Sequence, residues 1–225
     1  SFDEFYDAYK KQMEYFISLL VNADNAIDVA HAERCPLPFL SCMVDDCLKK
    51  GKSVQEGGAV YNFTGPQGFG IANMADGLFA VRQLVYDEKK ISMKELKEAL
   101  IWNYDKGLDA QSAGDIGTEI LKAMKAAGRN VDASTAAAVL NSLIGMKPEP
   151  DKLSRFKEIH DMIDEVPKFG NDIPEVDYFA REVAYTYTKP LQNYKNPRGG
   201  QFQAGLYPVS ANVPLGGQIG RASCR

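Results

Sequence analysis

The stretch of sequence that offers the clearest chemistry is the glycine-rich run from Gly57 to Gly70, GGAVYNFTGPQGFG. A helical pattern follows its glycines at positions 65, 68 and 70. Glycines at a helix N-terminus can cradle a phosphate, because free N–H groups and the helix dipole favour an anion there. However, no Lys-Ser or Lys-Thr pair follows these glycines, and their spacing is not G-x-G-x-x-G. The pattern therefore favours a tight strand-to-helix turn over a phosphate loop.

The cysteine and histidine side chains give less indication of a reactive site. The cysteines stand at positions 35, 42, 47 and 224, without a C-x-x-C pair, and the histidines are His31 and His160. No zinc-type cluster can be assembled at the usual spacings, so no metal site is expected. Buried, reduced thiols are the expected state, with Cys42 and Cys47 acting as small hydrophobic residues of a helix. A catalytic pair of Cys35 with His31 is disfavoured, because only Glu33 is near enough in sequence to orient the imidazole.

A second informative stretch runs from Pro197 to Gly216, PRGGQFQAGLYPVSANVPLG. Its β-branched and aromatic residues, punctuated by Gly, Pro and Asn, predict a strand and a loop on the floor of a pocket. We expect strands near Ala59–Phe63 and Phe202–Val213, each with an unpaired edge. The stretch has no acid and no histidine. Its side chains can line a small-molecule pocket but cannot carry protons there.

The elements around these stretches are predicted to be helices. Ser1 with Glu4 forms a capping box that opens a helix reaching Leu20, and a second helical segment runs through residues 27–30. Pro36 and Pro38 stop one helix and start the next near Phe39, which ends at Gly51. Further helices are expected after Gly70 as far as Val85, after the Ser92 and Glu95 capping box, and over 116–127, 133–144, 152–165 and 174–187. The aromatic residues at 178, 179, 185 and 187 are expected to pack the last helix down.

Composition limits the class of protein. The chain has 225 residues, a net charge of −4 and 45% hydrophobic residues, which is typical of a soluble globular protein. Lys and Arg alternate with Asp and Glu without a basic block, so nucleic acid is not an expected partner. Residues 1–30 contain neither a secretory signal nor a spanning segment. We therefore predict a cytoplasmic protein with no membrane partner.

Four blocks carry a resemblance to a known family: YNFTGPQGFGIANMADGLFAVRQLV, KFGND, YKNPRGGQF and GLYPVSANVPLG, in this order. Together they resemble the glycyl radical enzymes related to pyruvate formate-lyase. The branch they resemble most includes diol dehydratases, choline trimethylamine-lyase, isethionate sulfite-lyase and arylacetate decarboxylase. The resemblance covers nearly the whole chain, with residues 105–151 matching least.

The resemblance implies a fold. It predicts the α/β class, with this chain as a helix-rich fragment of a ten-stranded glycyl radical enzyme barrel. Residues 1–218 would belong to the barrel domain, with 105–151 as a helical insertion. The family's Gly-Cys-x-Glu loop would precede Ser1, and its Arg-Val-x-Gly-Tyr glycine motif would follow Arg225. The family pattern fails near Gly220, so residues 219–225, which match one reading frame of a sequencing adapter, are expected to be a non-native tail.

The resemblance also implies a function. The intact enzyme would be an anaerobic radical lyase that cleaves a C–O, C–N, C–S or C–C bond in a small polar substrate by thiyl-radical hydrogen abstraction. It would be a homodimer that carries a glycyl radical and is activated by a radical-SAM enzyme, whereas this chain alone would bind no cofactor and would be inactive. The alternatives are acyl transfer of the pyruvate formate-lyase type and a non-catalytic domain that binds an anion.

The expected site residues follow from the same resemblance. It places the PVSANVP block beside the glycine loop, so Val209, Ser210, Ala211, Asn212, Val213 and Pro214 are expected to line the substrate cavity. Glu33 is a further candidate, as a polar contact or proton carrier, because it stands just before the Pro36–Pro38 break. A capping carboxylate is the alternative role for Glu33.

Overall fold

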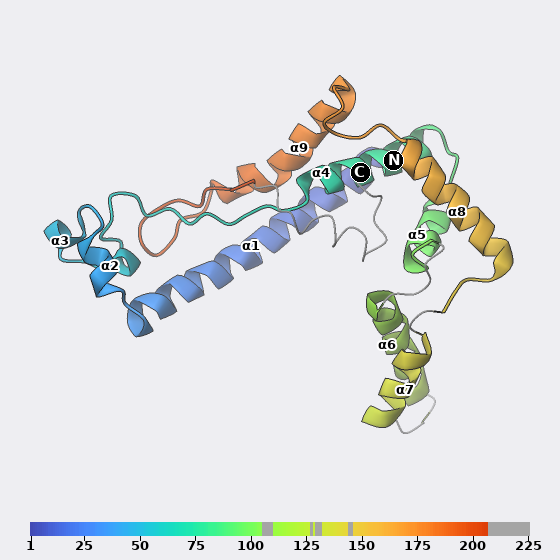
Figure 1. The fold of residues 1–225 in the computed structure, drawn as a ribbon, viewed down its shortest axis with the longest axis horizontal. Helices are drawn as coiled ribbons and strands as arrows, with labels where there is room; N and C mark the ends of the chain where they lie inside the picture. Colours follow the sequence, from blue (N-terminus) through green and yellow to red (C-terminus); the bar gives the residue numbers. More distant parts are fainter. Residues whose placement is uncertain (105–109, 127, 129–131, 144–145, 207–225) are drawn as a thin grey trace. The chain divides into compact units, whose positions relative to one another are not determined.

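A computed structural model describes residues 1–104, 110–126, 128, 132–143 and 146–206, and its elements belong to two compact units (Figure 1). The described part of the first unit is residues 1–72 and 177–206, and that of the second lies within residues 73–176, apart from the gaps just given. Within these described ranges, no helix is both long enough and apolar enough to cross a membrane.

The first unit is organised around helix α1, Phe2–Arg34. The predicted capping box is confirmed, because Ser1 Oγ accepts from the Glu4 amide at 3.3 Å while the Glu4 carboxylate holds the Ser1 amine at 2.7 Å. The predicted break between two helical segments is wrong, since the helix is continuous. No glycine or proline interrupts the segment, and Ile17 and Val21 bury one face in the middle of the helix. The helix ends before Pro36, as expected.

Helix α9, Pro174–Leu191, supplies the partner of that buried face. Tyr187 and Leu191 pack with Ile17, Val21 and Phe202 in one hydrophobic cluster. Nearer the other end of the helix, the ring of Phe179 lies 5.5 Å from the ring of Tyr6. The prediction for the four aromatic residues is therefore confirmed for positions 179 and 187, whereas the side chains at 178 and 185 are exposed.

Short helices follow α1. The predicted single helix from Phe39 to Gly51 is wrong: α2, Pro38–Cys42, and α3, Cys47–Lys50, are separated at Asp46, whose φ is 72°. The expected end at Gly51 is confirmed, with φ 62°. Cys47 is buried as predicted, but Cys35 and Cys42 are exposed free thiols. Cys224 lies outside the described residues.

Pairing in the first unit differs from the predicted strands. The described residues contain isolated β-bridges, with Thr64 parallel to Phe202 and Gln67 parallel to Gly205, instead of regular strands. The strand expected at Ala59–Phe63 is not formed, because Asn62 Nδ2 donates to the carbonyls of Gly57 (3.3 Å) and Ala59 (3.0 Å) and bends the backbone there. The described chain is thus helix-rich, as expected, and membership of a barrel stays a prediction.

The second unit is helical throughout its described elements. Its helices are α4 (Ile71–Val81, which begins in the first unit), the π-helical stretch η2 (Arg82–Asp87), α5 (Met93–Ile101), α6 (Ala110–Ala126), α7 (Ala133–Leu143) and α8 (Pro150–Glu165). The predicted α-helix up to Val85 therefore changes to π-helical geometry at Arg82, where the Glu88 amide donates to the Gln83 carbonyl at 2.8 Å.

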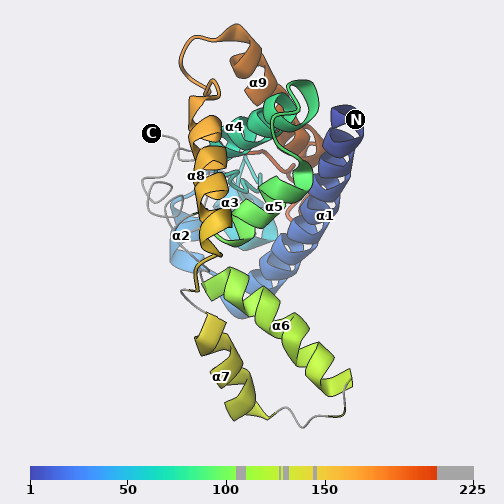
Figure 2. The same cartoon turned by 90° about the vertical axis from the view of Figure 1, so that its right-hand side faces the viewer.

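The two helices predicted in the Ala-rich region are confirmed as α6 and α7, which pack against each other (Figure 2). Gly117 lies in the contact: a Cβ there would be 3.6 Å from Leu143 Cδ1, an ordinary van der Waals distance. A methyl group would therefore fit at this position, and the contact does not require a glycine. Whether 105–151 is an insertion into a barrel remains a prediction.

Candidate functional site

The two stretches that stood out in the sequence meet in the first unit as a short parallel ladder. The Thr64 amide donates to the Gln201 carbonyl at 3.1 Å, and the Gln203 amide donates back to the Thr64 carbonyl at 2.9 Å. The Gly205 amide donates to the Pro66 carbonyl at 3.0 Å, and the Gly68 amide to the Gly205 carbonyl at 2.8 Å. Residues 64–68 and 201–205 therefore satisfy part of each other's backbone hydrogen bonding.

Glycines make this ladder possible, as the sequence suggested for the glycine-rich run Gly57–Gly70, here called the central loop. A Cβ on Gly68 would lie 2.7 Å from the ring of Tyr187 and 3.0 Å from Leu206 Cδ2. A Cβ on Gly200 would lie 1.9 Å from the Asn62 carbonyl oxygen. The shortest distance at each position is below what a Cβ tolerates, so each glycine is needed for the close approach of the chain. Neither glycine is therefore available to surround a ligand.

A set of polar side chains, the Arg198 lock, holds the start of the ladder. Arg198 Nε donates to Asp28 Oδ2 of α1 at 2.9 Å, and Arg198 Nη2 donates to the Phe63 carbonyl at 3.3 Å and Thr64 Oγ1 at 3.1 Å. Buried Asn196 adds bonds from its Nδ2 to the Asn62 carbonyl (2.5 Å) and Thr64 Oγ1 (2.9 Å). The lock thus joins α1, the central loop and the 195–200 turn.

Sequence reasoning missed the lock. Apart from Asp28 of α1, its members lie inside the blocks YNFTG and YKNPRGG, which were noted for glycine and proline rather than for their polar side chains. The available signal was the presence of Asn196 and Arg198 beside two glycines, because a tight turn buries nearby polar groups only when they find partners. Which partners they find depends on segments far away in the sequence.

Burial shapes the ionisation of groups near the lock. Burial raises the pKa of the Asp24 carboxyl, and the neighbouring carboxylate of Asp28 raises it further. Burial also raises the pKa of Tyr187, with a smaller contribution from the charge of Asp24. The Tyr187 hydroxyl therefore stays protonated at neutral pH, and its side chain packs in the hydrophobic cluster of the first unit.

The structure describes one of the predicted site residues, Glu33, and does not describe the others. Glu33 is an exposed residue in the last turn of α1, so its carboxylate is accessible to solvent. The predicted cavity residues Val209, Ser210, Ala211, Asn212, Val213 and Pro214 lie outside the described residues. The ladder ends at Gly205, which is four positions before the first of them. The structure therefore describes the chain that leads to the predicted cavity segment.

The second unit contains a surface pocket of about 360 Å³ beside the π-helical stretch. Arg82 lies on its wall, 3.5 Å from Asp87 Oδ2 and 3.8 Å from Glu175 Oε1, and Phe79 and Pro167 supply apolar lining. The charged side chains around the pocket partly neutralise one another. π-Helical turns are frequent at functional sites, but the geometry here specifies no ligand.

The KFGND block forms a loop that is tied to α4. Buried Asp76 accepts a hydrogen bond from the Phe169 amide at 2.8 Å. Lys168 Nζ donates to the carbonyls of Ile163 (2.6 Å) and Val166 (2.5 Å) at the end of α8. The Lys168 bonds close the end of α8, and the Asp76 bond ties the loop to α4, so both have a structural role.

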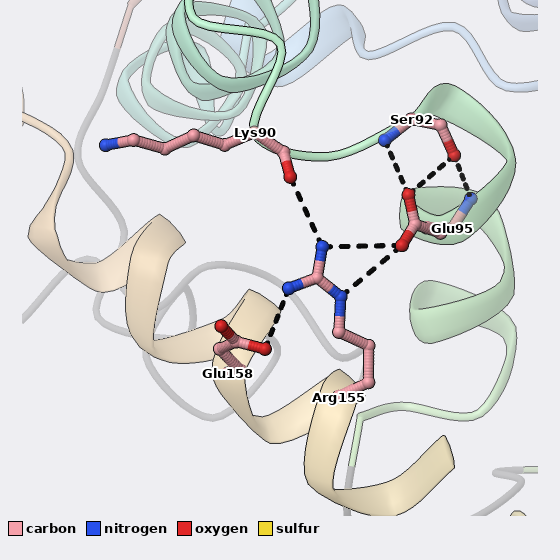
Figure 3. Close-up of polar contacts among 5 residues, drawn as sticks. All are labelled: Lys90, Ser92, Glu95, Arg155 and Glu158. Atoms are coloured by element: carbon pink, nitrogen blue, oxygen red, sulfur yellow. Dashed lines mark hydrogen bonds and ion pairs between the residues drawn. The ribbon is translucent and has the colours of Figure 1, made fainter. Parts of the chain in front are cut away.

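Helices α5 and α8 are clamped by Arg155 (Figure 3). Its guanidinium donates to Glu95 Oε1 at 3.3 and 3.4 Å, to Glu158 Oε2 at 2.7 Å and to the Lys90 carbonyl at 3.2 Å. Hydrogen bonds from Ser92 lower the pKa of Glu95, and Arg155 lowers it further. Just after the end of α5, burial raises the pKa of Tyr104 to about 12.

Among the residues that the structure describes, no group of three or more acidic, histidine or cysteine side chains could hold a metal ion. The site that the first unit does build is a support: a ladder, two close-packed glycines and the Arg198 lock. Such a support can hold a cavity wall in place. It contains no side chains arranged for nucleophilic or acid–base chemistry within the described ranges.

Comparisons with known proteins identify the relatives of this chain. A family model described as pyruvate formate lyase-like matches residues 1–216. A solved structure concerning 1,2-propanediol dehydration in Roseburia inulinivorans is 61% identical, with a TM-score of 0.87 over 97% of this chain and 26% of that one. The glycerol-bound B12-independent glycerol dehydratase of Clostridium butyricum is 45% identical, with a TM-score of 0.68 over 96% of this chain and 21% of that one.

A curated relative, the (2S)-3-sulfopropanediol dehydratase of Klebsiella oxytoca, is 32% identical over 96% of this chain and 20% of its own length. The chain thus spans between a fifth and about a quarter of the proteins it matches. These relatives are enzymes of the kind that the four sequence blocks predicted. The match over residues 1–216 shows that the chain belongs to the pyruvate formate lyase-like family.

Proposed function

We propose that this chain is part of a glycyl radical dehydratase that removes water from a small 1,2-diol by cleaving a C–O bond. The observation that carries the proposal is the 61% identity, over 97% of this chain, to the protein studied for 1,2-propanediol dehydration. The glycerol and sulfopropanediol dehydratases support the same bond type, because each name describes loss of water from a molecule with neighbouring hydroxyl groups.

The reaction balances without an external oxidant or reductant. A hydrogen atom leaves C1 of the diol, the C2 hydroxyl takes up a proton and leaves as water while the C1 hydroxyl gives up its proton, and a hydrogen atom returns to C2. The product is an aldehyde whose carbonyl carbon is C1. The family resemblance assigns the hydrogen-atom transfer to a thiyl radical that is regenerated in each cycle, with a glycyl radical installed by a radical-SAM enzyme. We further propose a homodimer as the active assembly.

This chain's own contribution would be cavity wall and support. Residues 209–214 have small or apolar side chains, apart from Asn212, and such a wall excludes water from a reactive radical. Glu33 remains a proposed polar contact or proton carrier, since its carboxylate is accessible. The ladder and the Arg198 lock lie in the same unit as the chain leading to residue 209 and would hold that wall.

The proposal of a non-catalytic anion-binding domain has less support. Its binding group would be the glycine loop, but the Gly68 amide already donates to the Gly205 carbonyl at 2.8 Å. Acyl transfer of the pyruvate formate-lyase type is the remaining alternative. The named reactions of the proteins matched over most of this chain speak for dehydration instead.

The test is a substrate panel on the full-length protein that carries this chain, activated without oxygen by a radical-SAM activating enzyme. The panel holds 1,2-propanediol, glycerol, choline, isethionate, and pyruvate with coenzyme A. We expect aldehyde from 1,2-propanediol, followed as NADH oxidation by a coupled alcohol dehydrogenase. The glycyl radical content is measured on the same sample by electron paramagnetic resonance, so that failed activation is recognised.

A radical-loaded enzyme that releases trimethylamine from choline, sulfite from isethionate or formate from pyruvate, and leaves both diols intact, would refute dehydration. The non-catalytic alternative is tested by titrating the chain with inorganic phosphate. Tight binding that is lost in Gly68→Val would favour it.

A further inference from the structure

The Arg198 lock is a set of buried and half-buried polar contacts that the reaction chemistry does not use. The side chains of Arg198 and Asp28 are 21% and 22% exposed, and Asn196 is 5% exposed. Such shielded ion pairs cost desolvation and lower the free energy only when every donor and acceptor is satisfied. In the lock, Thr64 Oγ1 accepts from both Arg198 and Asn196, and Asn196 Oδ1 accepts from the Gly200 amide at 2.8 Å.

The position of the lock affects the part of the chain that follows it. Its hydrogen bonds hold Phe63 and Thr64 on one side and the 196–200 turn on the other, immediately before the paired residues 201–205. Because side chains alternate between the faces of extended backbone, a slip of one residue in this pairing would turn Phe202 out of its buried place. The lock therefore lies where it can fix the register in which the chain arrives at Leu206.

We propose that Arg198 is a positioning residue: by holding Asp28, the Phe63 carbonyl and Thr64 Oγ1 together, it sets the register of the ladder between residues 64–68 and 201–205. The inference rests on the proposed function for its link to catalysis. Arg198 acts through the backbone and touches no reacting atom. Its guanidinium suits the role, since a rigid planar fork can satisfy several acceptors at once.

The test compares Arg198→Met with the wild type in the full-length protein. We expect faster amide hydrogen exchange at residues 64–68 and 201–205, measured by mass spectrometry on the unactivated protein. After activation we expect kcat/KM for the diol to fall about tenfold or more, because small misplacement of a substrate-positioning group has effects of this size. The glycyl radical content should be unchanged.

Arg155→Met is the matched control. Arg155 is also a guanidinium that bridges carboxylates and a backbone carbonyl, but it clamps α5 to α8 in the other unit. We expect it to lower the melting temperature comparably and to leave both kcat/KM and exchange at 201–205 unchanged. Arg198→Lys keeps the charge but loses the fork, so its kcat/KM should lie between those of Arg198→Met and the wild type.

Two outcomes overturn the inference: unchanged exchange at 201–205 in Arg198→Met, or faster exchange there with an unchanged kcat/KM. If Arg198→Met does not fold, Asp28→Asn carries the same comparison, since it weakens the ion pair and keeps an acceptor. Failure of the proposed function is distinguishable, because an inactive wild type with full radical content leaves the exchange experiment intact.

Discussion

Gly68 shows how one residue type controls a close contact in the first unit. Replacing it by alanine would put a Cβ 2.7 Å from the ring of Tyr187, which is 7% exposed and packed against α1. We expect Gly68→Ala to lower the free energy of unfolding by about 1–3 kcal/mol, the usual cost of overpacking. Chemical denaturation followed by circular dichroism measures this change.

The matched control is Gly77→Ala in α4. A Cβ at Gly77 meets no atom within 4 Å, and its backbone is helical. Alanine should therefore raise the free energy of unfolding by up to about 1 kcal/mol, because glycine is a poor helix former. The steric explanation for Gly68 is wrong if the two variants change stability in the same direction.

Val213 is the residue that tests the predicted cavity wall. If its side chain lines the cavity, Val213→Phe should reduce kcat/KM in the full-length enzyme while leaving the fold and the radical content intact, because a cavity wall tolerates added volume better than a filled core. Steady-state kinetics with spin quantification measure both quantities. Unchanged kinetics at full radical content would place Val213 outside the cavity.

At the scale of elements, the cap of α5 gives a pH-dependent prediction. The pKa of Glu95 is lowered from 4.5, first by hydrogen bonds from Ser92 and then by Arg155. A depressed carboxyl pKa stabilises the fold above the unfolded-state pKa, and this contribution is lost as pH falls through the folded-state pKa. Glu95→Gln should therefore be less stable than the wild type at about pH 7, and the difference should shrink at about pH 3.

Urea denaturation at the two pH values measures this difference. Glu119→Gln is the comparison, because the Glu119 pair with Lys122 is an exposed contact within one turn of α6 and such pairs contribute little. A Glu95→Gln penalty that persists undiminished at the lower pH would show that shape, rather than charge, is what the cap requires.

Sequence patterns predicted the elements whose causes are local. The capping boxes at Ser1 and Ser92, the stop at Gly51 and the paired helices α6 and α7 each depend on a few neighbouring residues, and all are confirmed. The continuity of α1 was missed because its middle is stabilised by burial of Ile17 and Val21 in the cluster with α9. Periodicity alone does not report such tertiary support.

The candidate site also has features that were predictable from the sequence and features that were not. The close approach at Gly68 was predictable, because a cluster of glycines around a proline already indicates a constrained path. The pairing of 64–68 with 201–205 and the Arg198 lock were not, since hydrogen-bond partners so far apart in sequence leave no periodic signal. The wall at 209–214 and the role of Glu33 stay predictions.

For the whole molecule, the relation to longer relatives gives a spectroscopic prediction. The 225-residue sequence contains neither a Gly-Cys-x-Glu nor an Arg-Val-x-Gly-Tyr motif, the two loops that the family resemblance associates with the radical. We expect the isolated chain, mixed with a radical-SAM activating enzyme and S-adenosylmethionine, to give no glycine-centred doublet in electron paramagnetic resonance. The full-length protein under the same conditions is the positive control.

A doublet from the isolated chain would contradict this prediction and would place a radical-bearing glycine among the 19 glycines present. Replacing the glycines of the central loop one at a time would then locate it. Loss of the signal in one variant alone would identify the residue.

The ladder also dictates an order of events during synthesis. Thr64 and Arg198 are 134 positions apart, and residues 73–176 of the second unit are encoded between them. As the ribosome adds residues from the N-terminus, this stretch is made before the partners of the first unit have emerged. Helix α1 must therefore keep Ile17 and Val21 exposed until Tyr187, Leu191 and Phe202 arrive. Closing so long a loop is slow, and that interval is when the nascent chain most needs a chaperone.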